Sequence, residues 1–344
     1  MTPNPTLASL GWSDDFDHLL GAAEREALVP ARVTGVHRAR LATLTANGAA
    51  ELALPPDLPA GDVAVGDWVL ADPDTGRVAR LLDRRSRIFR RAAGEEAREQ
   101  LIVANVDTVF LTTSCTEEFN EARLERYVAL AHAGGVPPVF VLTKTDCSDG
   151  PEAYVARLRA IGPTIPTVAL NARAPDAAEA LKPWCGPGQT VAFLGMSGVG
   201  KSTLASALTG LDLDTGEISA DQMRGRHTTT AREMHQIPGG GWLIDTPGMR
   251  ELRLTDMAEG IDEAFAEISA LAGQCRFRDC SHGPEPGCAV QAAVVAGAVD
   301  AARVERWKKL RAEDAGHSAQ ALDRRRKGKA LAKRVKAAKR IKGR

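Results

Sequence analysis

The stretch Gly195–Thr203 reads GMSGVGKST and fits the pattern G-x-x-x-x-G-K-[ST]. An apolar run, VAFL, precedes it and a helix-forming run, TLASALTG, overlaps its end. Glycines at this spacing let consecutive backbone N–H groups surround phosphates at a helix N-terminus, where the dipole favours anions. We therefore predict a phosphate-binding loop, although a glycine turn packed on a helix also fits the bare pattern. The loop comprises Gly195, Met196, Ser197, Gly198, Val199, Gly200, Lys201, Ser202 and Thr203.

Two side chains of this loop have separate predicted roles. Lys201 would neutralise the β and γ phosphates during catalysis. The Ser202 hydroxyl would bind Mg²⁺, a hard ion that accepts oxygen ligands.

A sensor of the γ phosphate is predicted downstream, where DTPG, Asp245–Gly248, follows an apolar run. Asp245 would hold Mg²⁺ through water, and the Gly248 N–H would contact the γ phosphate. The run Thr228, Thr229, Thr230 lies between loop and sensor, where a threonine completes the Mg²⁺ shell in the triphosphate state. We assign that role, and with it a catalytic one, to Thr229, although the sequence does not distinguish the three.

A guanine-binding segment is predicted at TKTD, Thr143–Asp146, which ends the apolar run PVFVLT. Asp146 can accept hydrogen bonds from guanine N1–H and N2–H₂, while the Lys144 stem stacks along the base. At LNAR, the Ala172 N–H can meet guanine O6. The predicted base site comprises Thr143, Lys144, Thr145, Asp146, Asn171 and Ala172. Alternatively, TKTD is a turn that closes a strand, and the protein uses ATP.

Both base-binding loops precede the phosphate loop, in the relative order they would have after it. This order indicates a circular permutation, in which one sheet is cut and rejoined at a surface connection.

The flanking sequence predicts the rest of the domain organisation. Short alternating segments over residues 31–95 favour a small β-barrel of the OB type, although another five-stranded barrel or sandwich has the same spacing. From Leu101, apolar runs alternate with helical stretches, which predicts parallel strands with crossover helices. REMHQI and WLID flank three glycines and predict an antiparallel edge hairpin.

Composition and charge narrow the class of protein. Hydrophobic residues make up 44% of the 344 residues, enough for a sizeable core. No basic region precedes an apolar run at the start, and CAVQAAVVAGAV is too short to cross a bilayer, so we expect a cytoplasmic protein without membrane contact. The tail Arg324–Arg344 holds 12 of the 44 basic residues and no acidic one, which leaves 32 basic against 44 acidic residues, a net charge of −12, elsewhere. Such a tail is usually solvated, but on an acidic protein it favours contact with phosphates.

A cysteine cluster follows the predicted sensor. CRFRDCSHGPEPGC places Cys275, Cys280, His282 and Cys288 in the spacing C-x4-C-x-H-x5-C. Three thiolates and an imidazole suit tetrahedral Zn²⁺ with no open position, so we predict one structural zinc per chain. Free core thiols or one disulfide remain the alternative.

The permuted motifs, the barrel in front and the cysteine cluster behind closely resemble the RsgA/YjeQ family of ribosome small-subunit-dependent GTPases over residues 30–310. The resemblance implies GTP and Mg²⁺ at the phosphate loop, G-x-H-T-T-T, D-T-P-G and N-K-x-D, and zinc at the four cysteine-cluster positions. It also implies binding to the small subunit near its decoding region during late maturation. Thr143 departs from the family pattern, because it replaces the Asn of N-K-x-D.

We therefore predict a multidomain α/β protein with a loosely structured N-terminal arm (1–30), an OB-type barrel (31–95), a circularly permuted P-loop GTPase domain (96–258), a helical zinc-binding domain (259–323) and a basic tail (324–344). We expect a monomeric GTP hydrolase whose partner is the small (30S) ribosomal subunit, through 16S rRNA and nearby ribosomal proteins. An RNA-binding scaffold with a vestigial nucleotide site is the alternative.

Water activation needs a further residue. Many GTPases carry a Gln directly after the sensor glycine, but Met249 stands there, and a thioether cannot orient water. We predict His227, just before the threonine run, as the catalytic replacement, because a neutral imidazole can accept a hydrogen bond from water. A solvated histidine in a loop is the alternative.

Overall fold

The computed structural model describes residues 5–91, 99–213, 233–244 and 257–316. The chain divides into two compact units, one of Met1–Phe89 with Gln100–Glu251 and one of Arg90–Glu99 with Leu252–Arg344. The five domain boundaries given above stay predictions. Among the described helices, none has the length and apolar character needed to cross a bilayer.

Five strands of the first unit form a closed barrel in the order β1-β2-β3-β5-β4, which confirms the OB-type prediction. β3 pairs with β5 in parallel, and the other neighbours are antiparallel. Alternate residues such as Ala31, Val33 and Leu41 point into an apolar core. The bounds are β1 Val29–Val36, β2 Arg40–Thr45, β3 Gly48–Ala53, β4 Trp68–Asp72 and β5 Arg77–Leu81, with the 3₁₀ helix η2 at Ala60–Asp62.

The N-terminal arm is ordered over residues 5–28, so our expectation of a loosely structured arm is wrong there. It contains η1 (Ala8–Leu10), α1 (Asp14–Asp17) and α2 (Ala22–Ala27). Leu10 and Phe16 are fully buried, and the Trp12 ring lies edge-on to Trp68 of the barrel with 4.8 Å between ring centroids. These anchors are spaced over elements too short to give a periodic pattern, which is why the sequence did not indicate them.

The other half of the first unit is a six-stranded sheet in the order β10-β9-β8-β11-β13-β12. All neighbours are parallel except β12 and β13, which are antiparallel, as the hairpin prediction required. β8, β9 and β11 are buried along their whole length, consistent with their continuous apolar runs. The bounds are β8 Thr108–Ser114, β9 Pro138–Thr143, β10 Thr167–Ala169, β11 Thr190–Gly195, β12 Met234–Gln236 and β13 Trp242–Ile244.

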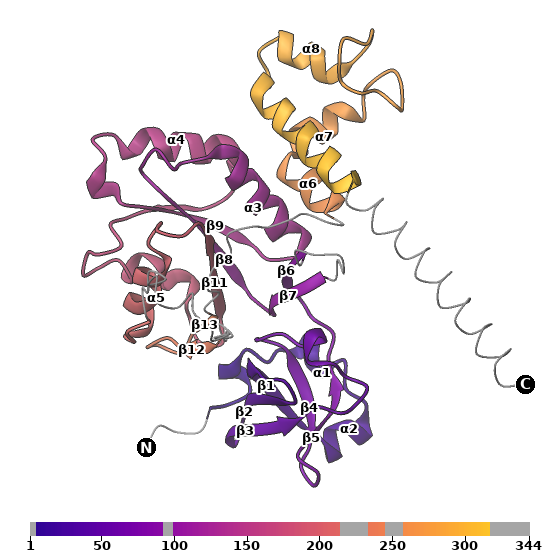
Figure 1. Ribbon diagram of the computed structural model, residues 1–344, viewed down its shortest axis with the longest axis vertical. Helices are drawn as coiled ribbons and strands as arrows, with labels where there is room; N and C mark the ends of the chain where they lie inside the picture. The colour runs from indigo at the N-terminus through magenta and orange to yellow at the C-terminus, as the bar shows by residue number, and fades with distance from the viewer. Residues whose placement is uncertain (1–4, 92–98, 214–232, 245–256, 317–344) are drawn as a thin grey trace, which may run out of the picture. The chain divides into compact units, whose positions relative to one another are not determined.

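Helices cover both faces of this sheet. Figure 1 shows α3 and α4 on one face and α5 on the opposite face. Their bounds are α3 Glu121–Ala133, α4 Pro151–Ile161 and α5 Lys201–Thr209, with 3₁₀ helices η3 Thr145–Cys147 and η4 Glu179–Trp184. The strand register pairs Gly195 with Thr112, and Thr143 with Ser114. The loops that follow β9 and β11 therefore begin at the same edge of the sheet.

A buried arginine fastens three parts of the first unit together. The Arg32 guanidinium donates to the backbone oxygens of Leu10 and Asn105, the latter at 2.9 Å, and to Thr190 Oγ1 at 3.0 Å. It also lies 5.4 Å from the centroid of the Trp68 ring. Burial lowers the pKa of Arg32 to about 10. The Arg32 side chain thus connects the N-terminal arm, the barrel and β11 through hydrogen bonds from one guanidinium group.

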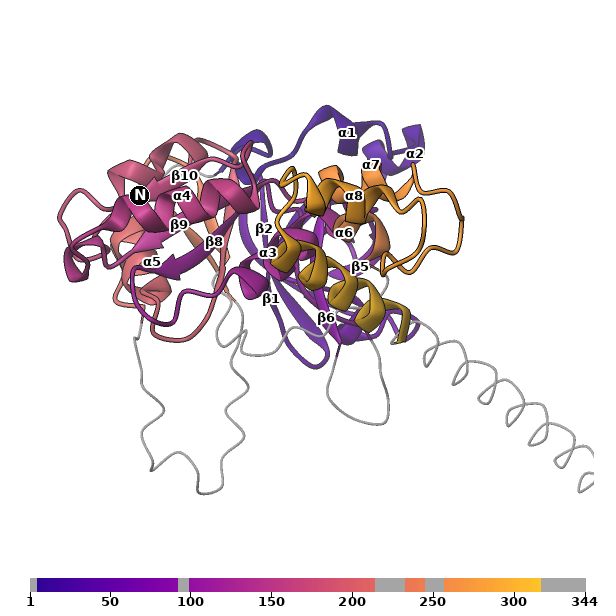
Figure 2. The ribbon, with the colours of Figure 1, turned by 90° about the horizontal axis from the view of Figure 1, so that it is seen from above.

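The second unit is helical. It contains α6 (Ala258–Ala264), α7 (Ala266–Ala272), α8 (Ala289–Val295) and a helix over 301–316. The segment between α7 and α8, which contains the cysteine cluster, is a loop in both views (Figures 1 and 2). Among the described residues of this unit, a small core packs these helices together, and its fully buried members include Ile261, Phe265, Ile268, Val290 and Trp307. The remaining strands, β6 Arg87–Arg91 and β7 Glu99–Ala104, form a two-stranded sheet.

Candidate nucleotide site and metal centre

The predicted phosphate loop connects the end of β11 to the start of α5. Gly198 (φ 81°) and Gly200 (φ 96°) have left-handed backbone conformations that favour glycine. A Cβ on Gly195 would lie 2.3 Å from the Thr112 backbone oxygen, so the close pairing of β11 with β8 also requires glycine there. A Cβ on Gly198 would meet no atom within 4 Å. The loop is therefore an open backbone cradle at a helix N-terminus, which fits a phosphate group.

The polar side chains at the end of the loop differ in their contacts and exposure. Lys201 Nζ spans the loop and donates to the backbone oxygens of Gly195, at 2.8 Å, and Met196. Ser202, in the first turn of α5, is exposed, and Thr203 beside it is half-buried. The Lys201 amine is thereby held by the backbone at the start of the loop, while the Ser202 side chain stays accessible.

Thr143 connects the predicted guanine segment to the phosphate loop. Its side chain is fully buried, and its Oγ1 lies 2.6 Å from the Val199 backbone oxygen and 3.0 Å from that of Thr113. The hydroxyl has one proton and two carbonyl oxygens within reach. The shorter of the two contacts is the one to the phosphate loop. The threonine that replaces the family's Asn therefore still braces the cradle.

The second base-binding loop reaches the same place. A Cβ on Gly200 would lie 3.4 Å from Ala172 Cβ and 3.8 Å from Thr143 Oγ1. Asn171 closes its loop, since its Oδ1 accepts from the Arg173 N–H at 2.9 Å. The structure thus brings together TKTD, LNAR and the phosphate loop, three segments separated in the chain.

The remaining members of the base site lie around the turn after β9. Lys144 is half-buried with a left-handed backbone (φ 56°), and it begins the turn that contains Thr145 and Asp146. Asp146 is exposed. A carboxylate in that position is free to accept hydrogen bonds from a base.

Several predicted site residues lie outside the described part of the chain. They are His227, Thr228, Thr229, Thr230, Asp245, Gly248, Met249 and the tail Arg324–Arg344. Their roles stay predictions.

The four predicted zinc ligands come together in the second unit. One ligand atom from each of Cys275, Cys280, His282 and Cys288 lies within 4.8 Å of the others. Cys275 Sγ lies 3.9 Å from Cys288 Sγ and 3.6 Å from His282 Nδ1, and Cys288 Sγ lies 3.8 Å from the same nitrogen. Tetrahedral Zn²⁺ would separate two sulfurs by about 3.8 Å and a sulfur from a nitrogen by about 3.6 Å. These distances fit a zinc ion bound through Nδ1.

The loop around this cluster is fixed by contacts that orient the ligands. His282 has a left-handed backbone (φ 57°), and its carbonyl accepts from Gln291 Nε2 at 2.7 Å. Burial, followed by the positive charge of Arg311, lowers the pKa of His282, which favours the neutral ring that a metal requires.

Glu285 is a supporting residue that the sequence analysis missed. Its carboxylate accepts from the backbone N–H groups of Ser281, at 3.0 Å, and Gly283, at 2.7 Å, as well as from the Ser281 hydroxyl. Hydrogen bonds, first from the Ser281 side chain, lower the pKa of Glu285 to about 2. An acidic residue inside the ligand loop was the only signal for this role.

Known proteins resemble this chain over most of its length. Residues 81–255 match the family model described as RsgA GTPase. A Mesorhizobium japonicum protein named small ribosomal subunit biogenesis GTPase RsgA is 51% identical over 315 residues, which cover 90% of each chain. A Vibrio vulnificus protein named small ribosomal subunit biogenesis GTPase RsgA 2 is 44% identical over 329 residues, covering 95% of this chain and 93% of that one.

The fold of this chain also resembles solved structures. The crystal structure of YjeQ from Thermotoga maritima has a TM-score of 0.63 and 26% identity, covering 82% of this chain and 97% of that chain. YloQ, described as a circularly permuted GTPase, has a TM-score of 0.59 at 21% identity and covers 83% and 94% of the two chains. The barrel, the permuted P-loop domain and the helical unit with its cysteine cluster confirm the predicted fold class.

Proposed function

This chain belongs to the RsgA GTPase family, and we propose that it hydrolyses GTP as a late-stage maturation factor of the small (30S) ribosomal subunit. The observation that supports the nucleotide chemistry most directly is the contact of Thr143 Oγ1 with the Val199 backbone oxygen, at 2.6 Å. This contact joins TKTD to GMSGVGKST, although the two segments are far apart in the chain, and so supports a single site made from both. A nucleotide site assembled in this detail argues against a vestigial one.

Each part of the site then has one task. The backbone N–H groups from Gly195 to Thr203 bind the phosphates, and Lys201 offsets their charge. Asp146 selects guanine, while Ala172 meets O6 of the base. Ser202, Thr229 and Asp245, the last through water, would hold Mg²⁺, which neutralises charge that develops on the phosphate oxygens. Gly248 would contact the γ phosphate.

His227 orients the attacking water in this proposal. Met249 follows the sensor glycine and has no group that can do so. Hydrolysis by the free protein is therefore slow, and contact with the subunit brings His227 into place.

The zinc centre has a structural role. Cys275, Cys280, His282 and Cys288 would hold one zinc ion per chain, which cross-links the loop between α7 and α8. The small core of this unit makes such a cross-link necessary for its stability.

The subunit is recognised through charge as well as shape. The basic tail Arg324–Arg344 and the basic sequence RVARLLDRRSRIFRR, which runs from β5 to β6, contact 16S rRNA phosphates, and nearby ribosomal proteins complete the interface. The protein acts in the cytoplasm as a monomer and leaves the subunit after hydrolysis.

Co-sedimentation with purified small subunits tests this timing. The full chain should bind subunits with a non-hydrolysable GTP analogue and dissociate with GDP. A chain that lacks Arg324–Arg344 should bind with a smaller dependence on salt concentration. Binding that is equal in both nucleotide states would contradict the timing role, and an unchanged salt dependence would remove the tail from the interface.

A further inference from the structure

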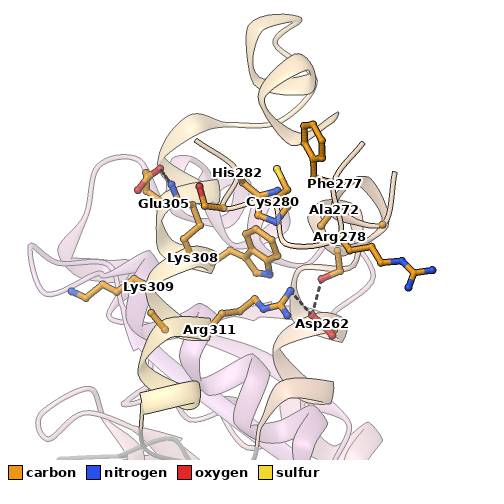
Figure 3. Close-up of a pocket in the computed structure, with 15 residues that line it drawn as sticks. Asp262, Ala272, Phe277, Arg278, Cys280, His282, Glu305, Lys308, Lys309 and Arg311 are labelled. Atoms are coloured by element: carbon orange, nitrogen blue, oxygen red, sulfur yellow. Dashed lines mark hydrogen bonds and ion pairs between the residues drawn. The ribbon is translucent and has the colours of Figure 1, made fainter. Parts of the chain in front are cut away.

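A cavity of about 750 Å³ opens beside the zinc-ligand cluster. Cys280 and His282 form one wall, and residues of α6, α7, the loop after α7 and the helix over 301–316 form the others. Figure 3 shows this cavity with Phe277 and Arg278 on one side and Lys308, Lys309 and Arg311 along the helix. The nucleotide site has no part in it, since none of the phosphate-loop or base-site residues lines the cavity.

The cavity has an excess of positive charge. Its lining includes four basic residues, Arg278, Lys308, Lys309 and Arg311, against two acidic ones, Asp262 and Glu305. Each acidic side chain already pairs with a basic one, Asp262 with Arg311 at 3.8 Å and Glu305 with Lys308 at 2.9 Å. Among the described residues, no acidic side chain pairs with Arg278 or Lys309. Two cations of the lining therefore remain available, and their charged ends point outward on opposite sides (Figure 3).

Aromatic rings lie close to basic side chains at this cavity. Phe277 is 46% exposed and is one of three large apolar side chains that are exposed in the described ranges. The Arg276 guanidinium lies 5.5 Å from its ring centroid. On the helix, Trp307 is buried, and the Arg311 guanidinium lies 5.2 Å from its ring centroid. An exposed Phe contributes little to folding, whereas its flat face can stack on a base.

The arrangement of these groups suits a strand of nucleic acid with its bases unpaired. Figure 3 shows Arg278 and Lys309 extending from opposite sides of the cavity, with Phe277 beside Arg278. A base on Phe277 would leave its two flanking phosphates directed toward opposite sides. A duplex does not expose the faces of its bases. The carboxylates that define an acidic peptide have no flat ring to stack on Phe277.

We propose that this cavity binds one unstacked nucleotide of a single-stranded RNA segment. The base stacks on Phe277, and the flanking phosphates contact Arg278 and Lys309. This inference rests on the proposed function for the source of the RNA, which is the small subunit. It adds a second recognition element, built on the zinc-binding loop, that reads an unpaired nucleotide where the basic tail reads only phosphates.

Fluorescence anisotropy with the full-length, zinc-loaded chain tests the proposal. The probes are a labelled single-stranded RNA of about ten nucleotides and a duplex RNA of equal length. Phe277→Leu keeps an apolar side chain but removes the aromatic face, so it should weaken single-strand binding about tenfold and leave duplex binding within about twofold. Phe277→Tyr should bind like the parent. Val295→Ala, which changes another exposed apolar residue of the same unit, is the matched control.

A second variant tests the cations. Arg278→Gln combined with Lys309→Gln should lower the slope of log affinity against log salt by about 1.4 for single-stranded RNA. Zinc content and helical circular dichroism of every variant must equal those of the parent. Single-strand binding by Phe277→Leu at the parent's affinity would overturn the proposal. So would a loss of poly-glutamate binding by that variant without a loss of RNA binding, which would indicate an acidic protein partner.

The same preparations separate this proposal from the proposed function. Parent chain that binds small subunits with the GTP analogue, while Phe277→Leu retains full single-strand affinity, would leave the GTPase role intact and remove the cavity from RNA recognition. Parent chain that binds single-stranded RNA through Phe277 but never binds small subunits would retain the cavity and contradict the ribosomal role.

Discussion

Thr143 Oγ1 lies 2.6 Å from the backbone oxygen of Val199, and through this contact the turn proposed to read guanine is attached to the loop proposed to hold phosphate. The two residues are brought together by the parallel order β9-β8-β11, which aligns the ends of strands β9 and β11. The contact is buried, so water cannot replace it. In the proposed site, base recognition and phosphate binding are therefore linked by this hydrogen bond.

Removing the Thr143 hydroxyl should weaken binding of the whole nucleotide. Thr143→Val keeps the shape but leaves the Val199 carbonyl without its buried donor, which costs about 1 kcal/mol or more. We expect GDP and GTP affinity to fall together by about tenfold, as measured with a fluorescent guanine nucleotide. Thr143→Ser, which retains the hydroxyl, is the control. Parent-like affinity in Thr143→Val would show that the contact does not position the loop.

Asp146→Asn should change base preference rather than phosphate binding. The amide cannot accept hydrogen bonds from both guanine N1–H and N2–H₂, so GTP affinity should fall by about 10- to 100-fold. Xanthosine triphosphate, whose C2 carbonyl accepts from an amide, should bind better than it does to the parent. Asp149→Asn, an exposed carboxylate in the same turn, is the matched control. If Asp146→Asn binds GTP as the parent does, or if ADP competes as well as GDP, TKTD is not a guanine reader.

Zinc removal should unfold the second unit first. Metal analysis should find about one zinc per chain in the parent, and Cys280→Ser should lose the metal together with helical signal from this unit. Cys147→Ser changes an exposed free cysteine outside the cluster and should keep both. Full zinc occupancy in Cys280→Ser would refute the four-ligand centre.

His227→Ala should separate affinity from turnover. GTP binding should stay near that of the parent, whereas turnover stimulated by small subunits should fall by a factor on the order of 10². The variant should also remain on the subunit longer, because release follows hydrolysis. Stimulated turnover within about twofold of the parent would mean that another group orients the water.

Sequence patterns predicted those parts of the protein that depend on the local spacing of one type of residue. Glycine spacing at Gly195–Gly200 located the phosphate loop, and cysteine spacing located a cluster whose S–S and S–N distances fit zinc. The loop order also indicated the permutation, because parallel strands place their carboxyl ends at one edge whatever the order in which the chain visits them.

Long-range contacts between residues without a motif could not be predicted in this way. The Arg32 bonds to Asn105 and Thr190 span 73 and 158 positions, and no local pattern marks those partners. Phe16 and Trp12 pack on Trp68 from an arm that we expected to be loose. Glu285 organises the zinc loop through backbone N–H groups, which every sequence supplies, so its role became visible only from the geometry.

GTP turnover with and without purified small ribosomal subunits tests the central claim most directly. The parent should hydrolyse GTP slowly alone and faster by orders of magnitude with subunits. Lys201→Ala, which removes the amine bound to the Gly195 and Met196 carbonyls, should hydrolyse GTP in neither condition while it keeps the parent's circular dichroism. Lys182→Ala, an exposed lysine elsewhere in the first unit, should behave like the parent. Turnover that subunits do not raise, or that Lys201→Ala retains, would contradict a subunit-stimulated GTPase at this site.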